Sequence, residues 1–299
     1  MEQERSPVAS RHPASREEDL GLVINTNVAA LSAQRNLSKT SADLQSSLAR
    51  LASGMRITSA KDDAAGLAIS EKLRAQIRGL MQGERNAQDG ISLVQTAEGA
   101  LNEVGNALIR LRELAVQAST GTIGDEERGY LNDEFKSLMT EIDRIANVTE
   151  FNGIHLLNGA ASSGISFQVG LSASVNDRIT ALIANVGTAS LGTASAALNA
   201  QSVSQVSRAQ SALAVIDAAI KDISHVRGGL GATQNRLQTT VNNLATFREN
   251  LSAADSRIRD VDVAEETVAM TRNQILMQAG IAVLAQANQL PSMALSLIG

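Results

Sequence analysis

The sequence predicts a mainly α-helical protein: an elongated rod of long antiparallel coiled-coil-like helices with a small central β-hairpin insert. The first observation is a row of apolar residues at seven-residue spacing, which keeps one seam facing a partner helix. Its members are Ile216, Ile223, Leu230, Leu237, Leu244, Leu251 and Ile258. A second row with the same spacing lies earlier in the chain, at Val94, Leu101, Leu108 and Ala115. Only 2% of residues are aromatic, which favours thin helix packing over a globular core.

The expected elements follow from apolar periodicity and from breaks in it. Helical patterns cover residues 22–55 and 64–119, separated by Gly54 and a polar stretch, and a third helix follows a Gly-rich loop at 120–124. Five glycines interrupt the second pattern and suggest close backbone packing there: Gly79, Gly83, Gly90, Gly99 and Gly105.

The middle of the chain changes character. Residues 152–192 are rich in Gly, Ser, Thr and Asn, and the alternating segment 165–169 with the β-rich segment 178–183 predicts a hairpin. Helix is expected to resume near Ala196 and run to about Arg257, and a last helix is expected at Ala264–Leu290. Residues 1–19 carry two prolines and mixed charge, so they are expected to be disordered.

Catalytic or cofactor sites are hard to find in this sequence. Cysteine is absent, and His12, His155 and His225 lie in three unrelated segments, where a metal site would need clustered ligands. The acid pairs Asp62-Asp63 and Asp260/Asp262 stand beside basic residues, which favours turn capping or solvated ion pairing. Gly228–Gly231 lacks the Lys and Ser/Thr of a phosphate-binding loop. We therefore expect no enzyme activity, no metal and no cofactor.

Charge and hydropathy exclude other classes. The net charge is −5 and spreads along the chain, without the basic patch expected of a nucleic-acid-binding protein. Apolar runs stay far below the roughly 20 residues of a membrane span, and the first residues lack the apolar stretch of a secretory signal peptide. We expect neither nucleic acid nor membrane as a partner.

Two apolar stripes at the chain ends predict self-assembly. They consist of Leu44, Leu48 and Leu51 near one end, and Leu276, Val283 and Leu290 near the other. Only each other, or further copies of the chain, are available to cover them.

Several motifs, taken together and in order, resemble bacterial flagellin over roughly residues 22–160 and 205–299. The N-terminal ones are VINTNVAAL (Val23–Leu31), LASGMRITSAKDDAAGLAIS (Leu51–Ser70), LIRLRELAVQAS (Leu108–Ser119) and FNGIHLLNG (Phe151–Gly159). The C-terminal ones are LGATQNRLQTTVNNL (Leu230–Leu244), SRIRDVDVAEE (Ser256–Glu266) and QAGIAVLAQANQLPSMALSLIG (Gln278–Gly299).

The resemblance implies a structural subunit that is exported and polymerises into the flagellar filament for motility. Residues 21–63 with 260–299 would then form a terminal helix pair lining the filament interior. Residues 64–151 with 196–259 would form the helical rod core, and residues 152–195 the β-hairpin and a reduced variable region. The chain would be extracellular and exported without a cleaved signal peptide.

The resemblance also implies partners. These are further copies of the chain, an export chaperone that holds the C-terminal helix, the filament cap, hook-junction proteins and, in a host, the innate immune receptor for flagellin. The receptor contacts map by position onto Arg110, Leu114 and Glu134.

Three other protein classes are alternatives to a flagellin-like subunit, and the N-terminus differs from the family pattern. A hook–filament junction protein shares the architecture but would match the motifs less closely. A chemoreceptor-type signalling rod would lack the β insert, and an enzyme would need a site constellation. Nineteen residues precede Leu20, where the family's initiator methionine aligns, so we expect residues 1–20 to be a leader outside the fold or a misplaced translation start.

Overall fold

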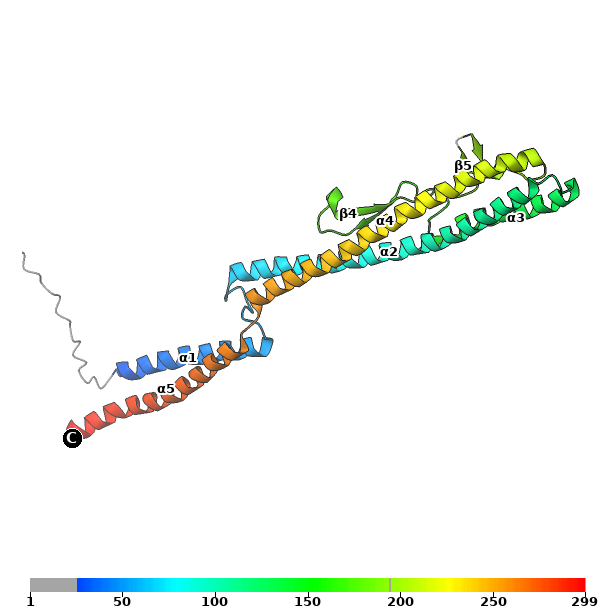
Figure 1. The fold of residues 1–299 in the computed structure, drawn as a ribbon. Coiled ribbons are helices and arrows are strands. Elements are labelled where there is room, and N and C mark those ends of the chain that lie inside the picture. The colour runs from blue at the N-terminus through cyan, green and yellow to red at the C-terminus, as the bar shows by residue number, and fades with distance from the viewer. Residues whose placement is uncertain (1–25, 194, 299) are drawn as a thin grey trace, which may run out of the picture. The chain divides into compact units, whose positions relative to one another are not determined.

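The computed structural model describes residues 26–193 and 195–298, with side chains up to residue 289. Its helices are α1 (Val28–Ser53), α2 (Ala64–Ala118), α3 (Asp125–Val148), α4 (Val206–Arg259) and α5 (Val263–Ile298), and its 3₁₀ turns are η1 (Val175–Asp177) and η2 (Leu198–Ala200). Its antiparallel strand pairs are β1 (Glu150–Phe151) with β2 (Ile154–His155), β3 (Ile165–Gln168) with β4 (Arg178–Ala181), and β5 (Gly192–Thr193) with β6 (Ala196–Ala197). The expected class, long helices with a small β insert, is confirmed (Figure 1).

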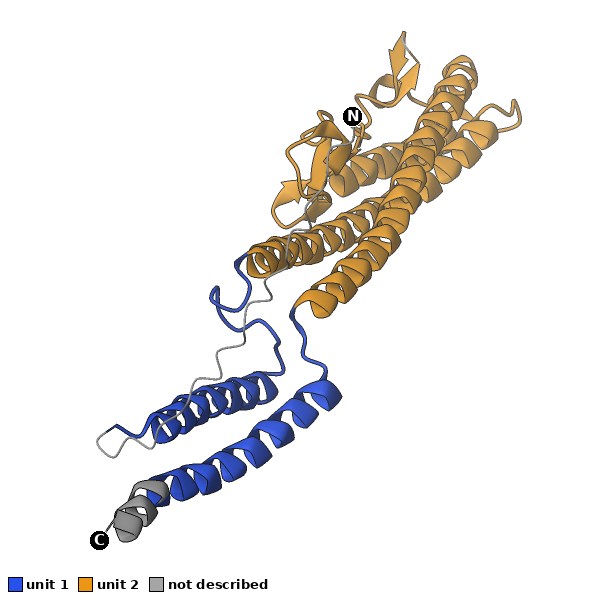
Figure 2. Cartoon of the chain, turned by 90° about the vertical axis from the view of Figure 1, so that its left-hand side faces the viewer, with its two compact units in different colours: residues 1–64, 259–299 blue, residues 65–258 orange. Residues whose placement is uncertain are grey.

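The chain divides into two compact units, coloured separately in Figure 2. One comprises residues up to 64 together with those from 259 onward, and we call it the terminal unit. The other comprises residues 65–258 and is called the core unit. The expected disordered leader, residues 1–20, lies outside the described residues.

Ion pairs give the register of α2 against α4 in the core unit. As α2 runs forward the partners on α4 run backward, through Glu84–Arg248 at 2.9 Å, Glu98–Arg227 at 3.7 Å and Arg112–Asp217 at 2.8 Å. The two helices are therefore antiparallel, as Figure 1 also shows. Because these side chains are partly exposed, they mark the register more than they stabilise it.

Apolar burial holds the core unit together. The α2 row Val94, Leu101, Leu108 and Ala115 is completely inaccessible to solvent. On α4 the row is buried from Ile216 to Leu237 and only half-buried from Leu244 onward. Helix α3 and the loops that follow it complete one continuous core, whose largest side chain is Phe135.

The β3–β4 hairpin packs on α2 because glycine lets it approach. Phe167 pairs with Ile179 across the hairpin, and its ring lies 3.1 Å from where a Cβ of Gly90 would stand. A Cβ on Gly83 would collide with the carbonyl of Val169, a backbone atom. Gly79, Gly83 and Gly90 thus confirm the expected close packing, whereas the same interpretation was wrong for Gly99 and Gly105, which face open space.

Helix α4 begins at Val206, not near Ala196 as expected. Leu198 and Val203 are both completely buried. Backbone amides within this segment donate to residues distant in the sequence. The amide of Val203 donates to Asn132 Oδ1 at 3.1 Å, and the amide of Asn199 to the carbonyl of Thr188 at 3.1 Å. These tertiary bonds outweigh the helical propensity of the alanine-rich sequence. The β5–β6 hairpin in this region and the β1–β2 hairpin directly after α3 were also not predicted from the sequence.

In the terminal unit α1 and α5 pair antiparallel, as a ladder of contacts shows. Its rungs are Asn27 with Ala287, Leu37 with Gly280, Arg50 with Glu266, and Met55 with Asp260. Helix α1 ends at Ser53 and is capped by Gly54, whose φ of +70° is the left-handed conformation that glycine adopts readily. Helix α5 continues to Ile298, through Pro291, and so extends beyond the expected end at Leu290.

Candidate functional site

The predicted assembly stripes do not all face the seam between α1 and α5. Leu44 and Leu51 are half-buried in the pair, while Leu48 is 49% exposed. On α5 the partly buried positions form a different row, which includes Met277, Gly280 and Ala287. The side chain of Leu290 lies outside the described residues.

The outer side of α5 carries large apolar side chains that are exposed to solvent. Leu276 is 50% exposed and Val283 58% exposed. Four more large apolar side chains of α5 are also exposed, namely Val263, Val268, Ile275 and Ile281. An amphipathic surface helix would carry polar residues on such a face, so α5 presents apolar surface on both sides.

The seam itself is polar at one end. Ser47 is the buried residue of α1, and Arg50 lies 3.6 Å from Glu266. These side chains line an open cavity of about 510 Å³ together with Arg56 and Asp262. This end of the seam, made of small and charged groups, buries little apolar surface and so contributes little hydrophobic stabilisation.

The residues matched to the receptor motif lie on α2 and α3 of the core unit. Arg110 donates from Nη2 to Glu134 at 2.8 Å and from Nη1 to Glu113 at 2.9 Å. The side chains of Arg110 and Glu134 are about half exposed. The hydrogen bonds to Glu113 and then to Glu134 raise the pKa of Arg110. The structure thus brings Arg110 and Glu134 together on a solvent-facing surface.

Leu114 differs from those two residues, because its side chain is completely buried in the core. The turn beside it is held by Arg128, a buried residue that the sequence interpretation missed. Its guanidinium donates to the carbonyls of Ala118 and Thr120 at 3.0 Å each, which lie at and just beyond the C-terminal end of α2. The available signal was an arginine three residues after Asp125 in the first turn of α3, where the two form an ion pair.

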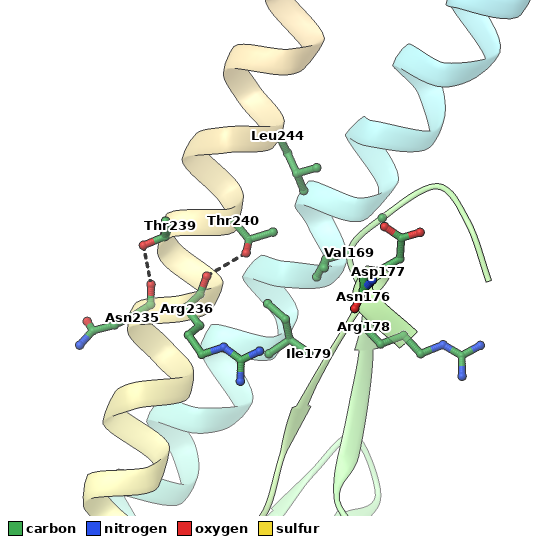
Figure 3. A pocket seen from close by; sticks show the side chains of 11 residues that line it. Val169, Asn176, Asp177, Arg178, Ile179, Asn235, Arg236, Thr239, Thr240 and Leu244 are labelled. Atoms are coloured by element: carbon green, nitrogen blue, oxygen red, sulfur yellow. Dashed lines mark hydrogen bonds between the residues drawn. The ribbon is translucent and has the colours of Figure 1, made fainter. Parts of the chain in front are cut away.

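An open cavity lies between the β3–β4 hairpin and α4, with a volume of about 510 Å³ (Figure 3). Ile179 and Leu244 line it with polar residues around them, and Thr239 and Thr240 bond back to their own helix, to the carbonyls of Asn235 and Arg236. No cluster of metal-ligating side chains occurs among the residues that the structure describes.

One acid of each pair singled out in the sequence accepts capping hydrogen bonds, Asp62 in a turn and Asp262 at a helix end. Asp62 Oδ2 accepts from the amides and hydroxyls of Thr58 and Ser59, at 3.0 to 3.2 Å. These bonds, led by that from the Thr58 hydroxyl, lower the pKa of Asp62 to about 2. Asp262 accepts from the amides of Ala264 and Glu265 and so caps the N-terminus of α5.

The histidines of the described chain do not cluster into a metal or catalytic site. His155 lies 4.0 Å from Glu150, and His225 is exposed on α4. His12 lies outside the described residues. No described helix has both the length and the apolar character that crossing a bilayer requires.

Comparison with known proteins gives consistent matches along the chain. Residues 24–162 match the model of the bacterial flagellin N-terminal helical region, and residues 213–298 that of the C-terminal helical region. A flagellin of Halalkalibacterium halodurans is 48% identical over 277 residues, covering 93% of this chain and 100% of that protein. The flagellar filament 33 kDa core protein of Treponema phagedenis is 43% identical, with coverages of 93% and 100%.

A solved structure agrees with the fold. A putative flagellar hook-associated protein from Vibrio parahaemolyticus superposes with a TM-score of 0.57, covering 67% of this chain and 100% of that one. At 15% identity this likeness concerns the fold alone.

Proposed function

The chain belongs to the bacterial flagellin family, and on that premise we propose that α1 and α5 are the surfaces through which its copies join. As a flagellin the chain is a structural subunit of the flagellar filament, an extracellular assembly. The observation that carries the proposal is the apolar outer side of α5, where Leu276 and Val283 stand in solvent.

The proposal assigns parts of the filament to parts of the chain. Residues 21–63 with 260–299 pair along the filament interior, residues 64–151 with 196–259 form the surrounding rod, and residues 152–195 pack on it. Burial supports this assignment, because the core unit encloses a large set of buried apolar side chains, whereas Ile57 and Ala287 are the buried apolar residues of the described part of the terminal unit. A second copy of α5 or α1 is the partner whose surface has matching chemistry.

Removal of residues 264–299 tests this assignment. We expect the truncated chain to remain a folded monomer, because the core unit keeps its own apolar core, and to form no filaments. Circular dichroism would report the fold, and electron microscopy of the purified protein the assembly. Normal filaments from the truncated chain would contradict the proposal.

We also propose that the chain acts as a building block without catalysis, and that it leaves the cell unfolded through the flagellar export apparatus without a cleaved signal peptide. An export chaperone would cover α5 before export, when its exposed apolar side chains would otherwise drive association. The filament cap and the hook-junction proteins would then contact the growing end. The structural character of the family supports this role.

Recognition by the innate immune receptor for flagellin is the remaining proposal. The exposed Arg110–Glu134 pair would be the contact, since a planar guanidinium between two carboxylates presents directed hydrogen bonds. The buried Leu114 would act by holding the helix that carries Arg110.

The matched test compares two exposed ion pairs on α2. We expect Arg110→Ala with Glu134→Ala to weaken receptor signalling by the monomer roughly tenfold, the loss of a hot-spot arginine. Arg112→Ala removes the similarly exposed pair with Asp217 and should leave signalling unchanged. Equal signalling by both variants would refute the receptor contact.

A further inference from the structure

Pro291 creates a gap in the hydrogen bonding of α5. The helix runs from Val263 to Ile298, and proline has no amide hydrogen to donate to the carbonyl four residues before it. That carbonyl belongs to Ala287, which is only 5% exposed. A buried carbonyl without a donor is unfavourable, so this one needs a donor from outside its helix.

Asn27 supplies that donor from the other helix. Its Nδ2 donates to the carbonyl oxygen of Ala287 at 2.7 Å. Its Oδ1 accepts from the amide of Ala30 at 3.0 Å and thereby caps the N-terminus of α1. A carboxamide has a donor and an acceptor on one planar group, whereas an aspartate would keep the cap and lose the donor.

At the opposite end of the seam the register is set by the backbone bridge of Met55 with Asp260, beside which Arg50 lies 3.6 Å from Glu266. Between the two ends Ser47 and Gly280 are small residues, and α5 carries apolar side chains on its outer side as well. In coiled coils a single buried polar group fixes register when the apolar residues alone would allow several. The Asn27–Ala287 hydrogen bond can select one register, because Pro291 leaves the carbonyl of Ala287, at this one position of α5, without its helical donor.

We propose that Asn27 is a positioning residue that recognises the proline gap in α5 and thereby fixes the register of the terminal helix pair at the end far from the Met55–Asp260 bridge. The contact lies inside one chain. It rests on the proposed function only for its consequence, that subunits with a slipped pair would join a growing filament less readily.

The chain contains no cysteine, so a pair of introduced cysteines can report the register. Leu37→Cys with Gly280→Cys reports the native pairing, because a Cβ on Gly280 would lie 3.3 Å from the Leu37 side chain. Leu37→Cys with Leu284→Cys reports a slip of about one turn. The measured quantity is the ratio of native to slipped disulfide after mild oxidation, in monomers and in filaments.

A double-mutant cycle between positions 27 and 291 then tests the proposal. We expect Asn27→Asp to lower the ratio roughly tenfold when Pro291 is present. With Pro291→Ala, the new amide satisfies Ala287, and the same change should lower the ratio less than about twofold. Asn36→Asp, at an exposed position of α1, is the control and should leave the ratio unchanged.

Circular dichroism would show that each variant is folded, and Asn27→Ser provides a second variant that keeps a cap acceptor without adding a charge. It should show the same dependence on Pro291. An equal drop in both backgrounds, no drop in either, or no native disulfide in the otherwise unaltered chain would overturn the proposal. Because the readout is intramolecular, normal filaments from the truncated chain would refute the proposed function and leave this inference standing.

Discussion

The core unit and the terminal unit are both built on long antiparallel helices, yet they bury their apolar residues to different degrees. In the core unit Leu101 and Leu108 are completely inaccessible. In the terminal unit Leu276 and Val283 are at least half exposed, and Ser47 is the buried residue of α1. Similar heptad patterns therefore lead to different structures. The row on α2 is buried in the core of one subunit, whereas the row on α5 stays exposed and can contact further copies of the chain.

The difference arises from what each helix pair has beside it. Helices α2 and α4 are joined by α3 and by the hairpin, which Gly83 and Gly90 admit to close range. Within the terminal unit α1 and α5 have mainly each other. Two helices alone bury one stripe apiece, so the second apolar side of α5 remains uncovered.

The largest expected effect comes from the same substitution in the two units. Leu101→Ala should lower the free energy of unfolding by about 2–5 kcal/mol, because it leaves a cavity in a closed core. Leu276→Ala should change it by less than about 0.5 kcal/mol in the monomer, since that side chain is half exposed. Denaturant unfolding of both monomers measures these values.

Filament assembly should be impaired more by Leu276→Ala than by Leu101→Ala, the opposite order from the loss of monomer stability. Leu276→Ala should slow growth from wild-type filament seeds, while Leu101→Ala should grow at temperatures where it stays folded. If Leu276→Ala destabilised the monomer as much as Leu101→Ala, the contrast between the units would be lost.

Glycine substitutions on α2 sharpen the account of the core unit at a smaller scale. Gly83→Ala should destabilise it by about 1–3 kcal/mol, because the new methyl meets the backbone of Val169. Gly99→Ala, on the same helix but facing open space, should stabilise it by up to about 1 kcal/mol through helix propensity. Thermal unfolding separates these opposite signs, and destabilisation by both would show that the hairpin contact is not the reason.

The smallest effect concerns the loop after α1, where the pKa of Asp62 lies at about 2 against an ordinary 3.8. The ionised form holds Thr58 and Ser59, so the loop should be fully ordered above about pH 4 and lose its order as the pH falls through about 2. Amide chemical shifts of Thr58 and Ser59 followed by NMR would report this. Asp62→Asn should abolish the titration, and an unchanged titration in that variant would assign it to another group.

Local patterns in the sequence predicted much of the fold. The heptad rows on α2 and α4 and the alternation at 165–169 are local, and they gave the long helices and the β3–β4 hairpin. The start of α4 was not predictable in this way, because residues near Val203 are held by Asn132, far away in the chain. The same applies to Pro291, which reads locally as a helix end but is accommodated within α5, where Asn27 satisfies the carbonyl of Ala287.

The site was predictable in outline only. Periodicity found the apolar residues of α5 but not which side would face α1, because α5 carries large apolar residues on more than one side. Leu276 and Val283 turned out to lie outside the seam, with Met277 and Gly280 inside it. Arg128 was missed because its burial depends on carbonyls that the turn after α2 brings to it.

Hydrogen exchange of the two units, measured in the monomer and in the filament, tests the central claim most directly. The account predicts that amides of α2, α3 and α4 are protected in both states, since their core is closed within one chain. It predicts that amides of α1 and α5 become strongly protected only in the filament, where further copies cover Leu276 and Val283. Equal protection of α1 and α5 in monomer and filament would contradict the account.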